Sequence, residues 1–541
     1  MMTSLISNAQ KPIRKLALAL CLMALPLAAK AKLSLVAQWG RFETSFRSGV
    51  SYASPFQQCT LKVTFTSPGG ETNDVYGFWD GGSTWRVRFS PDRPGRWTYR
   101  TSCSDLANAR LNDQTGEFVC TSPTSESRFA QHGPVQVARD RHHFEHADHS
   151  PFFWMADVAW DAPRLSNARD WATYLQVRSS QSFSAVQWAA APGADEKNHS
   201  AYSGQKRITI DPEYFQRLDE KIELMNRAGL LSVIAPLALP SPLVQNSGVT
   251  NDLPEDQAAL LVRYMVARWG AYDVAWLLTS DPNDGERWLK IGREVFGEIR
   301  HGPVVALPTP SASGFAFQNE DWVDAFGFGT GQYLSNNALQ WLIAGPLSRE
   351  WKIEPTRPLI NVLPPMENGL AAQGHERITA EDVRRIAWWS LLLMPPAGVS
   401  YGAQDVANWN PAVQSKLPTW QLSLFLPGAK QMRHITELFE SANWRSLRPA
   451  PHSLAIQPGS NSPRHYVTAS QTEEKDLSVI YVPEDRTLEV YLNALPPSPT
   501  IEWLNPRTGQ KSPAVAVVGA RTCQLPTPDA GDWVLVMKTG K

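Results

Sequence analysis

The sequence predicts an α/β fold, a (β/α)8 TIM barrel that is flanked by an N-terminal and a C-terminal β-sandwich. Between residues 140 and 448, apolar runs of strand length alternate eight times with amphipathic segments of helix length. On both sides of this region, short alternating segments are separated by turns that contain glycine and proline. Eight strand and helix units close naturally into a barrel of parallel strands, and the flanking patterns are typical of antiparallel sandwiches.

Residues 1–31 have the pattern of a signal peptide. A basic segment with Arg14 and Lys15 precedes the apolar run Leu16–Leu27, and Ala29-Lys30-Ala31 has the small-x-small form of a cleavage site. The run is shorter than the ~18 apolar residues expected of a membrane helix. Lipid attachment at Cys21 is disfavoured because bulky Leu20 precedes it. We therefore expect an exported protein, periplasmic or extracellular, without membrane insertion.

The charge balance argues against a polyanionic partner. The 51 basic and 52 acidic residues give a net charge of -1, so no broad field attracts nucleic acid or an anionic membrane. A neutral ligand such as a carbohydrate is expected. The 21 tryptophans fit this expectation, since indole faces pack on the C–H faces of sugars, although most of them should fill cores.

Residues 32–139 form the predicted N-terminal sandwich. Segments such as Cys59–Phe65 and Thr84–Phe89 alternate with period two and are separated by turns such as Asp80-Gly81-Gly82. Removal of the signal peptide leaves four cysteines in an oxidising compartment. Cys103 and Cys120 lie on consecutive strand-like segments, and we expect a disulfide between them. Cys523 lies too far along the chain to be assigned a partner.

Residues 140–448 form the predicted barrel. Its helices carry clear boundary signals: Asp211 and Pro212 begin one helix and Gly229 ends it, and Thr379 with Asp382 begins another. The eight expected strands are Phe152–Ala156, Ala185–Ala189, Leu231–Pro236, Val274–Leu278, Val304–Leu307, Ala325–Gly329, Leu359–Val362 and Val399–Gly402.

Residues 449–541 return to strand-like patterns and form the predicted C-terminal sandwich. The turn Asn505–Gly509 separates two of its segments. The expected strands are Leu477–Val482, Leu488–Leu492, Ile501–Leu504 and Trp533–Met537.

Two acids follow predicted barrel strands, Asp281 after strand four and Glu367 after strand seven. The C-terminal ends of barrel strands open onto one mouth, where acids that are distant in sequence can meet. A facing pair of carboxyl groups is the minimal apparatus for glycosidic bond cleavage. The alternatives are a helix N-cap for Asp281, although Asp284 is better placed for that role, and a salt bridge for Glu367.

Three barrel segments, 151–161, 358–368 and 397–403, resemble the apiosidase-like barrels of glycoside hydrolase family 140. The segments 77–100 and 503–536 resemble the sandwich that often precedes these barrels and the collagen-binding-like sandwich that often follows them. The resemblance implies a secreted hydrolase of plant or microbial polysaccharide, with its acids at the positions of Asp281 and Glu367. The chain departs from the family at Thr279, Ser280 and Leu363, where glycines and a glutamate are usual, so the resemblance does not fix the sugar.

These residues give a mechanistic hypothesis, in which Asp281 is the general acid and base and Glu367 is the nucleophile of a retaining glycosidase. Such a mechanism needs carboxyl groups ~5 to 5.5 Å apart, whereas ~6.5 to 9.5 Å would fit inversion. The alternative function is a non-catalytic carbohydrate-binding protein on a degenerate barrel, which the departures around Asp281 suggest.

Other residues at strand ends could form sugar subsites, with packing as the equal alternative for each. For Asp157, a structural tie to a neighbouring strand is equally expected. The candidates are Asp157, Trp160, Gln187, Trp188, Gln332, Tyr401 and Trp409.

No cofactor is expected, because the sequence contains no phosphate loop, nucleotide fingerprint or nucleophile elbow. A cluster with His142, His143, Glu145, His146 and His149 precedes strand one. Strand alternation places these histidines on different faces, so we do not predict a metal site.

Overall fold

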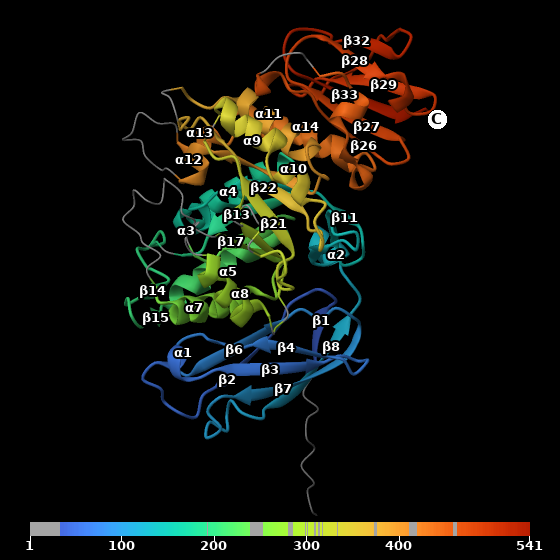
Figure 1. Ribbon diagram of the computed structural model, residues 1–541. Helices are drawn as coiled ribbons and strands as arrows, with labels where there is room; N and C mark the ends of the chain where they lie inside the picture. The colour runs from blue at the N-terminus through green and yellow to red at the C-terminus, as the bar shows by residue number, and fades with distance from the viewer. Residues whose placement is uncertain are drawn as a thin grey trace, which may run out of the picture.

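The barrel lies between the two sandwiches, with the N-terminal sandwich against one side and the C-terminal sandwich against the other (Figure 1). Among the helices that the structure describes, none combines the length and the hydropathy needed to cross a bilayer. The computed structural model describes residues 33–191, 193–237, 253–279, 285–297, 299, 301–307, 310–311, 314–315, 317–332, 334–372, 376–409, 419–457 and 462–540.

The N-terminal sandwich packs two sheets over an aromatic core. Alternate residues of one strand, Leu61, Val63 and Phe65, are fully buried, which is the pattern that predicted the sandwich. The larger sheet has the order β1 (Ser34–Ala37), β8 (Thr115–Thr121), β7 (Gly95–Cys103), β3 (Leu61–Thr66), β4 (Thr72–Tyr76), and the smaller has the order β2 (Phe42–Arg47), β6 (Thr84–Phe89), β5 (Phe78–Trp79).

The expected Cys103–Cys120 disulfide is wrong. In the antiparallel β7–β8 pair, Cys120 lies opposite Gly95, at the other end of β7 from Cys103. Eight residues of extended strand separate Gly95 from Cys103, a distance of about 26 Å at ~3.3 Å per residue. Two cysteines on neighbouring antiparallel strands come within bonding distance only when the register places them opposite each other, and the sequence did not reveal the register.

Eight parallel strands close into a barrel, which confirms the predicted fold class. The first and last strands pair from Trp154 opposite Gly398 to Val158 opposite Gly402, and this pairing completes the cylinder. The strands are β12 (Trp154–Val158), β13 (Ala185–Ala189), β16 (Leu231–Ala235), β17 (Val274–Thr279), β18 (Val304–Leu307), β21 (Ala325–Gly329), β22 (Leu359–Leu363) and β24 (Gly398–Ala403).

Strand seven is interrupted near the mouth. β22 ends at Leu363, Pro364-Pro365 follows, and the chain resumes pairing as β23 (Met366–Glu367). Met366 lies opposite Gly402 and Glu367 opposite Ala403 on β24. Proline cannot donate to a strand ladder, so the break follows from the Pro-Pro pair.

The helices surround the barrel and begin where their capping residues predicted. The Asp211 side chain accepts a hydrogen bond from Glu213 N, and Thr379 forms a reciprocal capping box with Asp382. The main helices are α4 (Ala168–Ser180), α5 (Pro212–Arg227), α7 (Glu255–Trp269), α8 (Gly285–Phe296), α9 (Asn336–Ala344), α11 (Ala380–Leu392) and α14 (Pro427–Glu440). Shorter helices include α1 (Pro55–Gln58), α3 (Ala162–Leu165), α12 (Gln404–Ala407) and α13 (Trp420–Ser423).

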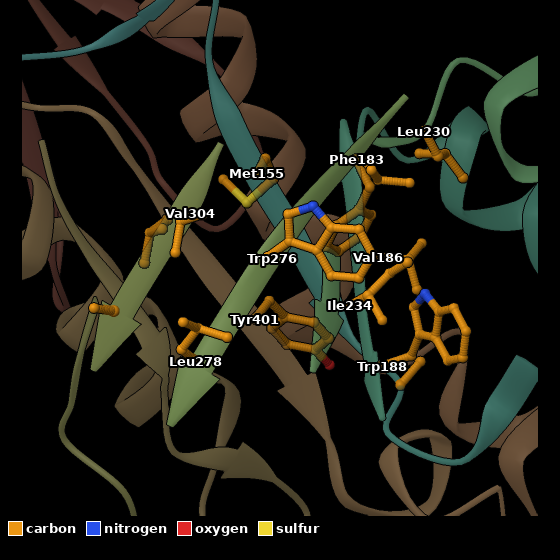
Figure 2. Packing of buried hydrophobic residues seen from close by; sticks show 14 of the residues in the cluster. Met155, Phe183, Val186, Trp188, Leu230, Ile234, Trp276, Leu278, Val304 and Tyr401 are labelled. Atoms are coloured by element: carbon orange, nitrogen blue, oxygen red, sulfur yellow. The ribbon is translucent and has the colours of Figure 1, made fainter. Parts of the chain in front are cut away.

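The barrel wall separates two apolar clusters, because successive strand residues point to opposite faces. The inner cluster, inside the barrel, includes Ala156, Val158, Ala185, Val233, Val305, Ile360 and Val362. The outer cluster, between the wall and the helices, includes Met155, Val186, Trp188, Ile234, Trp276, Leu278 and Tyr401 (Figure 2). Membership of one cluster or the other shows which way a strand residue faces.

A small antiparallel sheet lies where the chain enters the barrel, and it carries the histidine-rich segment. It comprises β9 (Val135–Val137), β10 (Phe144–His146) and β11 (Pro151–Phe152), and Phe144 and Phe152 join the inner cluster. The imidazoles have separate partners: His146 contacts Gly133 O and His149 contacts Glu145. Burial lowers the pKa of His146 to about 4.

The C-terminal sandwich confirms the second predicted β module. Trp503, Trp533 and Leu535 lie in its buried core. One sheet has the order β25 (Arg448–Pro449), β26 (Thr468–Gln471), β27 (Leu477–Val482), β33 (Trp533–Thr539), β29 (Pro499–Leu504), β30 (Lys511–Pro513), and the other has the order β28 (Thr487–Tyr491), β32 (Thr522–Pro526), β31 (Val517–Val518).

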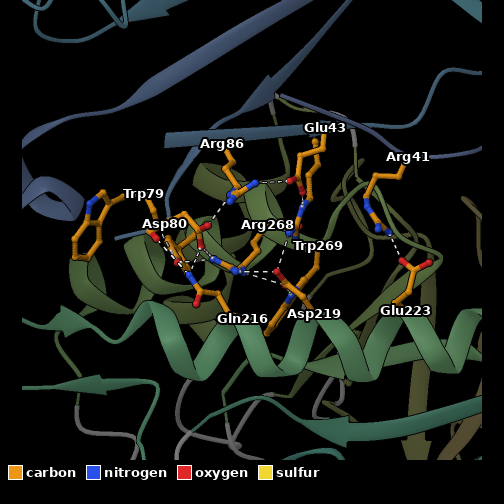
Figure 3. Close-up of polar contacts among 12 residues, drawn as sticks. Arg41, Glu43, Trp79, Asp80, Arg86, Gln216, Asp219, Glu223, Arg268 and Trp269 are labelled. Atoms are coloured by element: carbon orange, nitrogen blue, oxygen red, sulfur yellow. Dashed lines mark hydrogen bonds and ion pairs between the residues drawn. The ribbon is translucent and has the colours of Figure 1, made fainter. Parts of the chain in front are cut away.

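Arginine–carboxylate contacts fasten both sandwiches to the barrel. On the N-terminal side, Asp219 of α5 accepts hydrogen bonds from Arg268 of α7 (Figure 3). It also accepts one from Arg88 of β6. On the C-terminal side, Arg384 of α11 donates from two nitrogens to Asp532, at 2.6 and 2.7 Å. Bidentate pairs of this kind fix orientation as well as proximity.

Candidate active site

The barrel mouth is the expected active site, because the C-terminal ends of all eight strands meet there. Trp160 lies just beyond β12, packs with the inner cluster and is 7% exposed. Several segments that follow barrel strands, including 238–252, 280–284 and 410–418, lie outside the described residues. Asp281, the predicted general acid, falls in one of them.

Gln332 is a sequence-predicted subsite residue that the structure places at the mouth. Its Oε1 accepts from Met366 N at 3.0 Å, and its Nε2 donates to Gln404 Oε1 at 3.4 Å. Both glutamine side chains are half-buried. The two amides therefore meet between the ends of strands six, seven and eight, where they keep hydrogen-bonding capacity for a polar neutral ligand.

Two residues at the mouth, Gln404 and Asp161, were not singled out from the sequence. Gln404 directly follows β24, and this position is the signal that could have identified it. Asp161 follows Trp160 at the start of α3, where its carboxylate pairs with Arg164 and is 32% exposed. Burial raises the pKa of Asp161 although Arg164 lowers it, so this carboxyl is protonated more easily than an ordinary one.

Gln187 faces the barrel interior rather than an open cleft. Its Nε2 donates to Val362 O at 2.9 Å, and its Oε1 accepts from the Ser400 hydroxyl. The side chain is fully buried. These contacts join strands two, seven and eight across the interior, so they favour a structural role for Gln187.

Three aromatic candidates face the outer layer, and for them the packing alternative holds. Trp188 donates from Nε1 to Ser232 Oγ at 2.9 Å and lies, with Tyr401, in the outer cluster (Figure 2). Trp409 stacks on Trp420 with ring centroids 4.0 Å apart and is 2% exposed. Because these three side chains pack in the outer layer, the structure does not support the prediction that Trp188, Tyr401 and Trp409 form sugar subsites. The sequence could not show this, since strands that are apolar throughout do not indicate which of their faces points into the barrel.

Asp157 also faces the outer layer. Its Oδ2 accepts from the Tyr174 hydroxyl and from Arg178 Nε, both on α4 and both at 2.7 Å. The side chain is fully buried, and burial raises the pKa of Asp157 against the opposing effect of Arg178. The carboxyl ties strand one to its helix, which favours the structural alternative over a sugar contact.

Glu367 lies behind the barrel wall and not in an open mouth. Its neighbour Met366 joins the inner cluster, so the Glu367 side chain points to the opposite face. Oε2 accepts from the Tyr401 hydroxyl at 2.5 Å, and Oε1 accepts from Gly428 N at 3.1 Å. The residue is 3% exposed. The expectation that Glu367 faces the sugar as a nucleophile therefore needs correction for the described conformation.

The surroundings of Glu367 are those of a helix cap. Gly428 is the second residue of α14, and the cap residue Leu426 offers no side-chain acceptor to the first turn. The Glu367 carboxylate takes that place at the positive end of the helix. Burial raises the pKa of Glu367, while the bonds from Tyr401 and the backbone of α14 act in the opposite direction.

The inward position at the end of strand seven belongs to Leu363. This side chain packs against the inner cluster and beside Gly329 of strand six. An apolar residue therefore occupies the place from which a strand-seven acid would reach the axis. Within the described ranges, no three His, Cys, Asp or Glu side chains gather as a metal site.

Comparisons with known proteins agree with this architecture. Residues 138–446 match the family model described as "Apiosidase-like, catalytic domain". Residues 35–104 match a domain of unknown function, and residues 450–538 match the putative collagen-binding domain of a collagenase. No significant match was found among curated proteins.

Solved structures share the fold at low sequence identity. A putative glycoside hydrolase from Bacteroides vulgatus has a TM-score of 0.68 at 20% identity, with coverage of 93% of this chain and 99% of that one. A family 5 glycoside hydrolase from the same species has a TM-score of 0.64 at 18% identity, with coverage of 76% and 94%. Another structure, named glycoside hydrolase, has a TM-score of 0.65 at 18% identity, with coverage of 77% and 98%. The chain thus belongs to the apiosidase-like catalytic-domain family and is a glycoside hydrolase.

Proposed function

We propose that this protein is exported and cleaves a plant or microbial polysaccharide or oligosaccharide at the barrel mouth. The observation that carries the proposal is the closed barrel with Trp160 and the amide pair Gln332 and Gln404 at the ends of its strands. An aromatic ring and neutral amides suit a neutral sugar. The near-zero net charge of the chain supports the same substrate class.

Asp281 is the proposed general acid and base. Its support is its position two residues after Thr279, the last residue of strand four. Asp161, above strand one, is a second carboxyl for sugar contact, since it is partly exposed.

A retaining mechanism with Glu367 as nucleophile requires a rearrangement at strand seven. Glu367 would have to leave the Tyr401 hydroxyl and the N-terminus of α14 and turn to the inner face of the wall. The described contacts support a positioning role, in which Glu367 holds α14 against strands seven and eight.

The second candidate function is glycan binding without turnover on this barrel. The specific observation in its favour is the orientation of two side chains at strand seven: Leu363 points toward the barrel interior and Glu367 points toward the helices. A barrel that cannot present a second acid would retain a sugar without cleaving it.

Kinetics of two variants on a glycan found by screening defined oligosaccharides would separate these roles. Asp281→Asn should lower kcat about 10² to 10⁴-fold, the usual share of a general acid. Glu367→Ala should lower kcat as strongly, and azide should restore turnover, if Glu367 is the nucleophile. A modest loss with lowered stability would identify it as a positioning residue.

The matched control is Glu376→Gln, an exposed acid in the loop after strand seven, which should leave turnover unchanged. NMR of the first-formed product anomer tests retention, and an inverted anomer would refute it. Binding of the glycan without turnover by the parent protein would overturn the proposed cleavage of that glycan at the barrel mouth and favour the second candidate.

A further inference from the structure

Two buried cysteines of the N-terminal sandwich face each other. The Sγ atoms of Cys59 and Cys103 lie 3.4 Å apart, and the residues are 5% and 2% exposed. Cys59 is the C-cap residue that follows helix α1, and Cys103 is the last residue of β7. Both are free thiols in this structure.

The backbone holds the two cysteines in this arrangement. Leu61 pairs with Cys103 across the β3–β7 ladder. One residue further out, Ser104 N donates to Thr60 O at 2.9 Å, and Thr60 N donates to Ser104 Oγ at 2.9 Å. The pairing therefore continues beyond the strand ends and holds Cys59 diagonally across the ladder from Cys103, with the two Sγ atoms in contact.

The other two described cysteines are isolated from this pair. Cys120 lies opposite Gly95 at the far end of β7, and Cys523 lies on β32 of the C-terminal sandwich. Geometry thus selects one pairing among those that four cysteines allow.

We propose that Cys59 and Cys103 form a disulfide when the protein folds in an oxidising compartment. The oxidant is a disulfide-bearing thiol oxidant, protein or small molecule, which acts by thiol–disulfide exchange through a mixed disulfide. One Sγ–Sγ bond forms, the two cysteine thiols give up two protons and two electrons, and the oxidant disulfide is reduced to two thiols. The supply of oxidant in the cell rests on the proposed export.

Because both thiols are buried in the folded protein, the disulfide is expected to form during folding rather than after it. Exclusion from water raises the pKa of the Cys59 thiol to about 12, and the contact with Cys103 acts in the same direction. Because the thiolate is the reactive form, the folded pair reacts slowly with an external oxidant. The bond is therefore expected to form during folding, before β3 and β7 close over the pair.

The proposed bond would strengthen the side of the sandwich that docks on the barrel. Helix α1, directly before Cys59, places Phe56 against Tyr264 of α7 with ring centroids 5.7 Å apart. The neighbouring Gln57 donates to Ile208 O and to Gln257 Oε1, at 2.9 and 2.7 Å. A covalent tie from Cys59 to β7 thus anchors α1 on the sandwich while its side chains contact the barrel.

Refolding of the purified chain in oxidised and reduced glutathione tests the proposal without reference to activity or export. Alkylation under denaturing conditions, followed by non-reducing digestion and mass spectrometry, should find one peptide that joins Cys59 to Cys103. Recovery of both cysteines as alkylated thiols, or linkage of either to Cys120, would overturn the proposal.

Thermal unfolding adds a second readout with a matched control. In the oxidising buffer, Cys59→Ser should lower the Tm of the transition in which the sandwich unfolds, alone or together with the barrel, by about 10 °C, as should reduction of the parent with dithiothreitol. Cys120→Ser, an equally buried thiol in the same domain, should not reproduce the effect of reduction. An equal Tm for the oxidised and reduced parent would contradict the stabilising role, and the peptide map remains decisive if Cys59→Ser fails to fold.

Discussion

Glu367 and Leu363 lie four residues apart at the end of strand seven, yet they contact opposite sides of the barrel wall. Leu363 packs with the inner cluster, whereas Glu367 bonds to Tyr401 and to the first turn of α14. The faces along strand seven therefore depend on two irregularities, the register shift opposite Phe328 and Gly329, which leaves Val362 and Leu363 both against the inner cluster, and the Pro364-Pro365 break. An uninterrupted strand would place residues 363 and 367 on the same face.

The titration of Glu367 gives a prediction with a defined sign. Burial raises its pKa above the ordinary 4.5, so the folded protein holds this proton more tightly than the unfolded chain does. The parent should lose stability as the pH rises from about 4.5 through the folded pKa, whereas Glu367→Gln has no such loss. In chemical unfolding between pH 4 and pH 7, the free energy of unfolding of the variant should increase relative to that of the parent as the pH rises. Glu376→Gln, which removes an exposed acid, should show no such trend, and a parallel course for all three proteins would refute the buried titration.

The residue scale is also where prediction from sequence was weakest. Asp157, Trp188 and Tyr401 were expected to follow strand ends, but they lie within β12, β13 and β24, and the face to which each side chain points was not predictable. Barrel strands are buried on both sides and read as continuous apolar runs, so they lack the polar alternation that marks an inward face. Register limits prediction in the same way, as the separation of Cys103 from Cys120 shows.

Helix α14 is the element whose start depends most directly on a distant residue. An added Cβ at Gly428 would lie 2.3 Å from Glu367 Oε2 and 2.8 Å from Val383 Cγ2. The first turn therefore has room for the carboxylate only because residue 428 has no side chain.

Gly428→Ala should therefore destabilise the protein, against the usual effect of this change. In a free helix the change stabilises by about 1 kcal/mol, whereas here the methyl group must displace a buried carboxylate, and we expect a net loss of about 1–3 kcal/mol. Urea unfolding, monitored by circular dichroism, measures this change in the free energy of unfolding. Lys430→Ala, at an exposed position two residues later, serves as the control and should change stability by less than about 0.5 kcal/mol. A gain in stability for Gly428→Ala would contradict the described packing.

The bounds of strands and helices were predicted far better than the side of the barrel wall to which each strand residue points. Ala185–Ala189, Val304–Leu307 and Ala325–Gly329 have the predicted bounds, since turn residues delimit each apolar run. The Thr379 capping box could be recognised in the sequence because its two residues, Thr379 and Asp382, are only three positions apart. The break in strand seven was missed, although Pro364-Pro365 was its signal.

At the scale of the whole molecule, buried charges join the domains. Arg268 pairs with both Asp219 and Asp80 (Figure 3). Arg88 pairs with Asp219 and with Glu43. Burial alone would raise the pKa of Asp219, but the two arginines outweigh it and lower that pKa below the ordinary 3.8. This contribution to stability is present above pH 3.8 and is lost as the pH falls through the folded pKa. The sandwich–barrel contact should therefore weaken under strong acid.

Removal of the Asp219 charge should uncouple the sandwich from the barrel. Asp219→Asn leaves Arg88 and Arg268 buried without their shared counter-ion, and one-sided loss of a buried pair costs about 3–5 kcal/mol. In the parent, the two domains should unfold in one calorimetric transition, whereas the variant should show an earlier transition for the sandwich. Glu223→Gln provides the comparison, since Glu223 sits one turn later on α5 in a more exposed pair with Arg41 and should cost under about 1 kcal/mol. A single unshifted transition in Asp219→Asn would mean that apolar contacts such as Phe56 against Tyr264 hold the interface without this cluster.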